Sequence, residues 1–68
     1  SESAEAGFQA CLLVPNSERY IQRVPEMLAK VERYKDAVQV LNAYISATGS
    51  DEERVITLRD KYQRKMKQ

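Results

Sequence analysis

The sequence contains no histidine and only one cysteine among its 68 residues. A single cysteine cannot form a disulfide within the chain, and without histidine or paired cysteines the usual zinc sites have no ligands. Histidine is also the most frequent general base in enzymes, and no Gly-rich phosphate-binding loop is present. We therefore expect a protein that is not an enzyme and that carries no cofactor.

Glycine and proline are also scarce, with two of each, and no apolar run approaches the roughly 18 residues of a membrane span. No alternation of apolar and polar residues is long enough to build a sheet, whereas residues 17–47 are mostly good helix formers. The sequence predicts an all-α fold of three to four short antiparallel helices, either a helical-hairpin repeat or a small bundle. We interpret residues 1–68 as a single helical domain or a fragment of a helical-repeat domain.

Charge of one sign does not dominate, because 11 basic side chains are balanced by 10 acidic ones. This balance disfavours a general nucleic-acid-binding or anionic-membrane-binding surface. The lone Cys11 lies in an apolar run and fits a reducing compartment, so we expect a cytoplasmic or nuclear protein.

The short chain limits the stability that one core can provide. A chain of this length buries only about 60% of its unfolded surface, and a lone core of this size rarely supplies more than about 3 to 5 kcal/mol. Because disulfides and metals are excluded, self-association or neighbouring repeats remain as supplements.

Turn signals divide the chain into helices. The first is predicted at about residues 4–13, and the segment from Pro15 to Ser17 indicates a turn followed by a helix cap. Within the second helix, Pro25 either kinks the helix or starts a new one. A turn near residues 32–33 is expected to separate the second helix from the third, although neither glycine nor proline marks it.

The last helix has the clearest start signal. The segment from Thr48 to Ser50 indicates a helix stop at Gly49 followed by a new start. Ser50 and Glu53 have the spacing of a capping box, which predicts that the helix begins just after Ser50.

Each predicted helix carries a stripe of apolar residues three and four positions apart, which predicts its buried face. In chain order the stripes are Phe8, Cys11 and Leu12; Ile21, Val24, Leu28 and Val31; Tyr34, Ala37, Val38, Leu41, Tyr44 and Ile45; and Val55, Leu58, Tyr62 and Met66. The run from Ala10 to Val14 is more apolar than one helix face requires. We expect it to be buried against the rest of the chain or against another protein.

The stripes repeat along the chain. A shift of 34 residues places Ile21 on Val55 and Val24 on Leu58, which superposes the second helix on the fourth. A shift of 33 residues similarly places Phe8 on Leu41, which superposes the first helix on the third. The four helices therefore alternate between two types.

This order and period resemble the tetratricopeptide repeat family, in which a helix A, a short turn and a helix B form each unit. The resemblance covers residues 18–51 and rests on Leu28, Tyr34, Ala37 and Leu41, together with the string from Glu32 to Val38. It departs from the family pattern at Pro25, Glu32, Tyr44 and Gly49. The resemblance implies a scaffold of packed helical hairpins that binds other proteins.

Tyr20, Arg23, Met27 and Lys30 are the candidate partner-binding residues, because their 3-4-3 spacing places them on one face of the second helix beside its apolar stripe. The alternative is that this face is only solvated. In support of a solvated face, Glu26 and Lys30 have the spacing of a favourable helical ion pair.

A second candidate surface is the basic end of the chain, where Arg64, Lys65 and Lys67 form a possible basic contact. These residues could bind phosphates, but a basic last turn also complements the helix dipole. Aromatic residues that could stack on bases are limited there to Tyr62.

These features predict a non-catalytic protein–protein interaction module or scaffold that binds a partner peptide or helix in an interhelical groove. One alternative is a homo-oligomerisation domain, in which the stripes of the last two helices pair with a second copy. The other is nucleic-acid contact through the basic C-terminal helix.

Overall fold

The computed structural model describes residues 3–67, and throughout these residues the only regular secondary structure is helical. The helices are α1 (Ala4–Leu13), α2 (Glu18–Ile21), α3 (Val24–Lys30), α4 (Tyr34–Thr48) and α5 (Glu53–Met66). The predicted all-α class is therefore confirmed. Since α2 is a single turn, the second predicted helix corresponds to α2 and α3 together.

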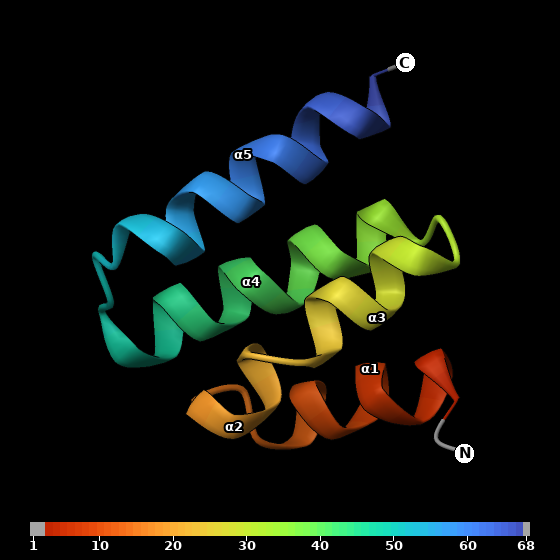
Figure 1. Ribbon diagram of the computed structural model, residues 1–68. Helices are drawn as coiled ribbons and strands as arrows, with labels where there is room; N and C mark the ends of the chain where they lie inside the picture. The colour runs from red at the N-terminus through yellow and green to blue at the C-terminus, as the bar shows by residue number, and fades with distance from the viewer. Residues whose placement is uncertain (1–2, 68) are drawn as a thin grey trace.

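The four longer helices run alternately in opposite directions and form a body of 27 × 27 × 14 Å (Figure 1). Helix α3 packs against α1 and α4, α1 also packs against α4, and α5 packs against the other side of α4. Helices α3 and α5 consequently run in the same direction, with α4 between them (Figure 1). Residues of α3, α4 and α5 line a common groove.

A serine caps the start of each of the first two helices. Ser3 Oγ accepts a hydrogen bond from the Ala6 amide, and Ser17 Oγ accepts one from the Tyr20 amide, so each serine satisfies an amide that has no partner within its helix. Between α2 and α3, the chain restarts rather than kinks, because Pro25 lies in the first turn of α3. Proline is tolerated there because its missing amide hydrogen would have had no partner.

The turn at residues 32–33 closes α3 without glycine. The Glu32 amide donates to the Ala29 carbonyl and the Arg33 amide donates to the Leu28 carbonyl, a Schellman arrangement that satisfies the last carbonyls of the helix. Glu32 has a φ of 61°, the left-handed conformation that glycine usually supplies at this position. The predicted turn is confirmed.

The predicted capping box at Ser50 is wrong. Helix α5 begins at Glu53, and Ser50 Oγ accepts a hydrogen bond at 3.2 Å from the amide of Glu52, one residue before the capping-box partner Glu53. The Ser50 amide in turn donates to Thr48 Oγ1, which ties Ser50 to the end of α4. A serine whose side chain closes a local turn competes with its use as a helix cap.

The core lies where α1, α3 and α5 meet α4. Its least exposed side chains include Leu28 and Leu41, both 0% exposed, and Val40, which is 1% exposed and belongs to no predicted stripe. Close approach of α1 and α3 explains the buried Gly7, since a Cβ there would lie 3.3 Å from Val24 Cγ2. The core side chains are Cys11, Ile21, Val24, Leu28, Ala37, Val38, Val40, Leu41, Tyr44, Val55 and Tyr62.

Three residues assigned to buried stripes are exposed instead: Leu12, Val31 and Met66. Each lies in the last turn or at the C-cap of its helix. Leu13 and Val14 are also exposed, so the run from Ala10 to Val14 is not buried within this chain as a whole. Its other expected use, burial against another protein, stays a prediction.

Candidate interhelical binding groove

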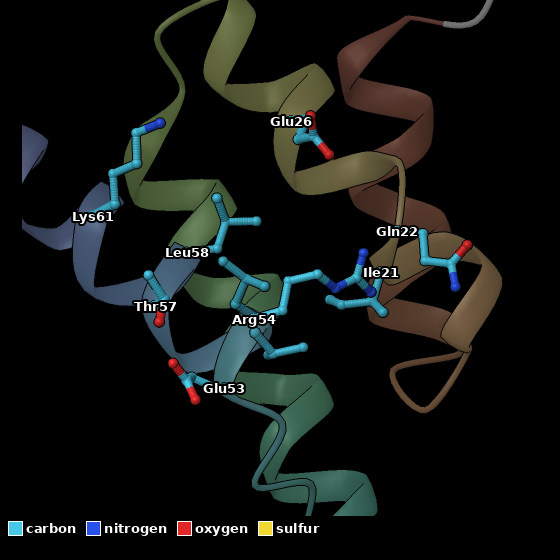
Figure 2. Close-up of a pocket in the computed structure, with 10 residues that line it drawn as sticks. Ile21, Gln22, Glu26, Glu53, Arg54, Thr57, Leu58 and Lys61 are labelled. Atoms are coloured by element: carbon cyan, nitrogen blue, oxygen red, sulfur yellow. The ribbon is translucent and has the colours of Figure 1, made fainter.

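A groove lies between α3 and α5, and its larger part is an apolar hollow of about 580 Å³. Ile21 from α2, Leu41 from α4, and Val55 and Leu58 from α5 form its apolar surface. Figure 2 shows Ile21 and Leu58 among the lining side chains. Ile21, Leu41 and Val55 are at most 6% exposed, and Leu58 is half-buried. Such a hollow can remove apolar side chains of a partner from water.

Charged and polar side chains surround the apolar hollow, namely Gln22, Glu26, Glu53, Arg54, Thr57 and Lys61. Figure 2 shows Arg54 extending from α5 toward Ile21. The rim contains two acids and two bases, so it has no excess charge. A polar rim around an apolar centre is the usual composition of a protein-binding surface.

A second, smaller hollow of about 330 Å³ adjoins the first and is called here the lysine hollow. Glu26 and Lys61 line both hollows, so the two hollows are parts of one groove. The lysine hollow is lined by Glu26, Ala29, Lys30, Tyr34, Lys61, Tyr62 and Lys65. It therefore combines three ammonium groups with two tyrosines.

The two tyrosines of the lysine hollow pack together, with ring centroids 5.8 Å apart and planes tilted by 42°. Tyr62 is 5% exposed, as predicted for a core residue, whereas Tyr34 is only half-buried. Burial raises the pKa of the Tyr62 hydroxyl, and the nearby Glu26 carboxylate raises this pKa further. Tyr62 is thus a neutral hydrogen-bonding group at neutral pH.

The predicted partner-binding residues are brought together only in part. Arg23, Met27 and Lys30 line a third, shallow hollow of about 320 Å³ together with Gln22 and Glu26. Tyr20 is exposed and lines none of the three hollows. It belongs to α2, which ends at Ile21, so the single continuous helix on which the four residues were predicted to share a face is interrupted before α3. Lys30 alone among the four also lines the groove.

The predicted basic contact is divided in a similar way. Lys65 lines the lysine hollow, whereas Arg64 and Lys67 are exposed and line none of the three hollows. Lys61 and Lys65 are one helical turn apart on α5, which places them on the same face. The structure therefore places Lys30 from one predicted surface and Lys65 from the other around the same hollow.

The expected ion pair between Glu26 and Lys30 does not form, and within residues 3–67 the ion pairs involve Arg33 and Arg59 only. The helical spacing of Glu26 and Lys30 permits a pair, but both side chains instead line the open hollows. Sequence reasoning missed Glu26 as a groove residue. Its signal was weak, because an exposed glutamate on a helix usually indicates a solvated face.

The part of the chain that the structure describes contains no group of acidic, cysteine or histidine side chains arranged to hold a metal. No helix within residues 3–67 is long and apolar enough to cross a membrane. Comparisons of the chain with protein-family models, with curated proteins and with solved structures gave no match.

Proposed function

We propose that this chain is a non-catalytic protein–protein interaction module that binds a peptide or helix of a partner in the groove between α3 and α5. The observation that carries the proposal is the 580 Å³ apolar hollow, whose surface is formed by Ile21, Leu41, Val55 and Leu58. Of these four side chains Leu58 is the most exposed, and a partner that covers it and the hollow would remove apolar surface from water.

The arrangement of the helices supports a repeat scaffold. The stripes of α3 and α5 superpose with a 34-residue shift, and both helices pack against α4 in the same direction (Figure 1). In an array of such units, each pair of equivalent helices would border a groove of this kind. The free, buried Cys11 is compatible with the reducing compartment that we propose for the protein.

The alternative of self-association through α4 and α5 receives less support. Their stripe residues Tyr44 and Tyr62, which do not belong to the apolar hollow, are 5% exposed and pack within the chain. A second copy would have to use other residues, such as the exposed run Leu12–Val14.

The proposal can be tested with peptides selected from a random 12-residue display library against the whole chain. In NMR titrations of a selected peptide, we expect the largest shift changes at Ile21, Val55 and Leu58. Leu58→Ala should weaken binding about fivefold or more, because it removes apolar contact area. The matched control is Leu13→Ala, since Leu13 is 83% exposed on α1, away from the groove.

Thermal melts of both variants would verify that they remain folded before binding is compared. Shift changes confined to Leu12–Val14, with binding lost in Leu13→Ala and retained in Leu58→Ala, would show that the binding surface is the α1 edge. That result would overturn the groove as the functional site.

A further inference from the structure

The groove has two chemically different ends along α5. Near the start of the helix, Val55 and Leu58 belong to the apolar hollow, whose rim charges balance. Further along, Lys61 and Lys65 belong to the lysine hollow, where Lys30 contributes a third ammonium from α3. An occupant that lies along α5 therefore meets apolar surface at one end and positive charge at the other.

The positive charge of the lysine hollow is not neutralised within the described chain. Three lysines face a single acid, Glu26, and none of these four side chains forms an ion pair with another residue of the 3–67 segment. All three lysines are exposed at the surface, so their ammonium groups are accessible to a ligand. Ammonium groups gathered around one hollow attract a carboxylate or another anion.

The tyrosines of this hollow add neutral hydrogen-bonding groups. Neither the Tyr34 nor the Tyr62 hydroxyl makes a hydrogen bond to any of the residues described. A phenolic hydroxyl can donate to a carboxylate oxygen, and such a bond is stronger than one between neutral groups. The lysine hollow thus offers both charge and hydrogen-bond donors.

We infer that the partner segment is acidic and amphipathic: its apolar side chains occupy the hollow formed by Ile21, Val55 and Leu58, and its carboxylates lie at Lys30, Lys61 and Lys65. This inference rests on the proposed function. It specifies the chemistry of the ligand and which end of the groove its apolar and acidic parts occupy. Val55 and Lys65 are ten positions apart, which corresponds to about 15 Å of helix. A segment of about ten helical residues, or about five extended ones, spans both hollows.

A protein segment fits these features better than a nucleic acid. A phosphate backbone would find a charge-balanced, apolar surface over half of the groove and the Glu26 carboxylate where the two hollows meet. The rings of Tyr34 and Tyr62 are packed on each other, and Tyr62 is only 5% exposed, which leaves little aromatic surface for stacking with bases.

The test uses 12-residue peptides selected by display against the whole chain. We expect the selected peptides to have apolar residues toward one end and aspartate or glutamate toward the other. Their affinity should fall as salt is raised, because exposed charge pairs are screened. A triple variant, Lys30→Gln, Lys61→Gln and Lys65→Gln, should weaken binding at least tenfold and should remain folded because the three side chains are exposed.

The matched control removes the same charge elsewhere, with Lys35→Gln, Arg64→Gln and Lys67→Gln, three exposed residues outside the hollows. This control should leave affinity nearly unchanged. Equal weakening by both triple variants would show that affinity depends on the net charge of the chain and not on the lysine hollow. That result would overturn the inference.

Two further results distinguish this inference from the proposed function. If selected peptides lack acidic residues, lose affinity in Leu58→Ala and are unaffected by the lysine variant, the groove binds protein segments but the inference fails. If no selected peptide maps to the groove, both fail. A fluorescent 20-nucleotide single strand that binds at low salt and is released by the lysine variant would overturn the acidic-segment assignment in favour of nucleic acid.

Discussion

At the scale of single residues, two positions in the described chain have a positive φ, one occupied by glycine and the other by glutamate. Gly49 ends α4 with a φ of 68°, while Glu32 ends α3 with a φ of 61°. An L-residue in this conformation costs roughly 1 to 2 kcal/mol because its Cβ approaches the carbonyl oxygen, and glycine avoids this cost. The chain therefore uses the favourable residue at one turn and an unfavourable one at the other.

Opposite substitutions at these positions should have opposite effects. Gly49→Ala should lower the free energy of unfolding by about 1 kcal/mol, a backbone cost because no atom lies within 4 Å of the added Cβ. Glu32→Gly should raise the free energy of unfolding by up to about 1 kcal/mol. The gain is reduced by the larger conformational entropy that glycine loses on folding. Urea denaturation measures both changes.

The exposed, mid-helix substitution Gln39→Gly is the control and should cost about 0.5 to 1 kcal/mol. If Glu32→Gly destabilised the protein as much as Gln39→Gly does, the left-handed strain at Glu32 would be refuted.

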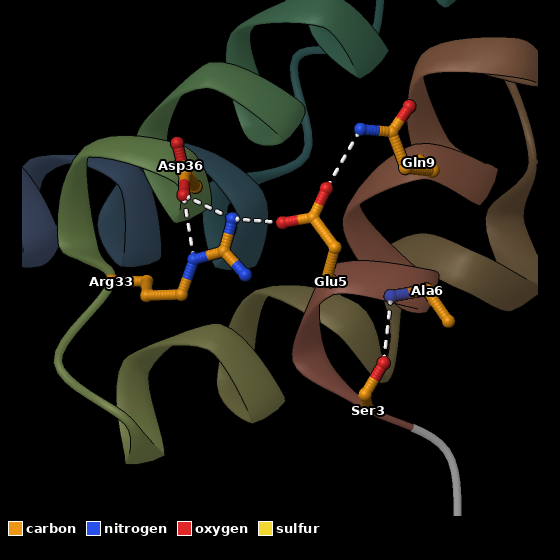
Figure 3. A network of polar contacts seen from close by, with 6 residues as sticks. All are labelled: Ser3, Glu5, Ala6, Gln9, Arg33 and Asp36. Atoms are coloured by element: carbon orange, nitrogen blue, oxygen red, sulfur yellow. Dashed lines mark hydrogen bonds and ion pairs between the residues drawn. The ribbon is translucent and has the colours of Figure 1, made fainter.

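At the scale of helices, one polar network joins the starts of α1 and α4 (Figure 3). The Arg33 guanidinium contacts both Glu5 Oε1, at 2.8 Å, and Asp36 Oδ2, at 2.6 Å. Glu5 Oε2 also accepts a hydrogen bond from Gln9 Nε2, and the guanidinium lies 5.4 Å from the centroid of the Phe8 ring. Arg33 thus connects two helices that are far apart in sequence.

This network predicts a pH dependence. The hydrogen bond from Gln9, and then that from Arg33, lowers the pKa of Glu5 below its ordinary value of 4.5. Since the folded-state pKa is below the unfolded value, the ionised carboxylate stabilises the fold above about pH 4.5, and this contribution is lost as pH falls through the folded-state pKa. Glu5→Gln should therefore be less stable than the original chain at pH 7, and the difference should shrink below pH 4.5.

A double-mutant cycle of Glu5→Gln and Arg33→Gln, followed by chemical denaturation at pH 7 and at pH 3, isolates the pair. We expect a measurable coupling at pH 7 that diminishes at pH 3. Strictly additive effects at pH 7 would mean that this exposed ion pair contributes nothing, as is the case for many surface pairs.

At the scale of the whole molecule, a small core makes each buried contact a large fraction of the stability. Leu28 is 0% exposed on α3, the helix that packs against both α1 and α4. Replacing a buried leucine by alanine costs about 2 to 5 kcal/mol, while a core in a chain this short rarely supplies more than about 3 to 5 kcal/mol. The two ranges overlap, so one cavity can remove most of the stability.

Leu28→Ala should consequently be largely unfolded or melt many degrees lower, as measured by circular dichroism during heating. Leu13→Ala has the same chemistry but is 83% exposed, and its stability should change by less than about 0.5 kcal/mol. Retention of a cooperative transition near the original temperature in Leu28→Ala would show that the core is more stable than its size predicts.

Much of the fold was predictable because its signals are local. The period of the apolar stripes identified the helices, and Ser17 and Gly49 marked helix limits through backbone constraints that depend only on near neighbours. Pro25 indicated a kink or a restart, and only the structure decided between them. The capping box at Ser50 was predicted wrongly because Thr48 and Ser50 offered a competing local turn, and spacing alone does not rank such alternatives.

The candidate groove could not be predicted from the sequence, because it depends on how α3 and α5 are placed relative to each other. Lys30 and Lys65 are 35 residues apart in the chain, and they line one hollow only because both helices pack in the same direction on α4. The sequence by itself determined the helices and most of their buried faces, since helical periodicity follows from hydrogen bonds between near neighbours. Only tertiary packing decided which side chains became the apolar surface of the groove and which lysines were gathered beside it.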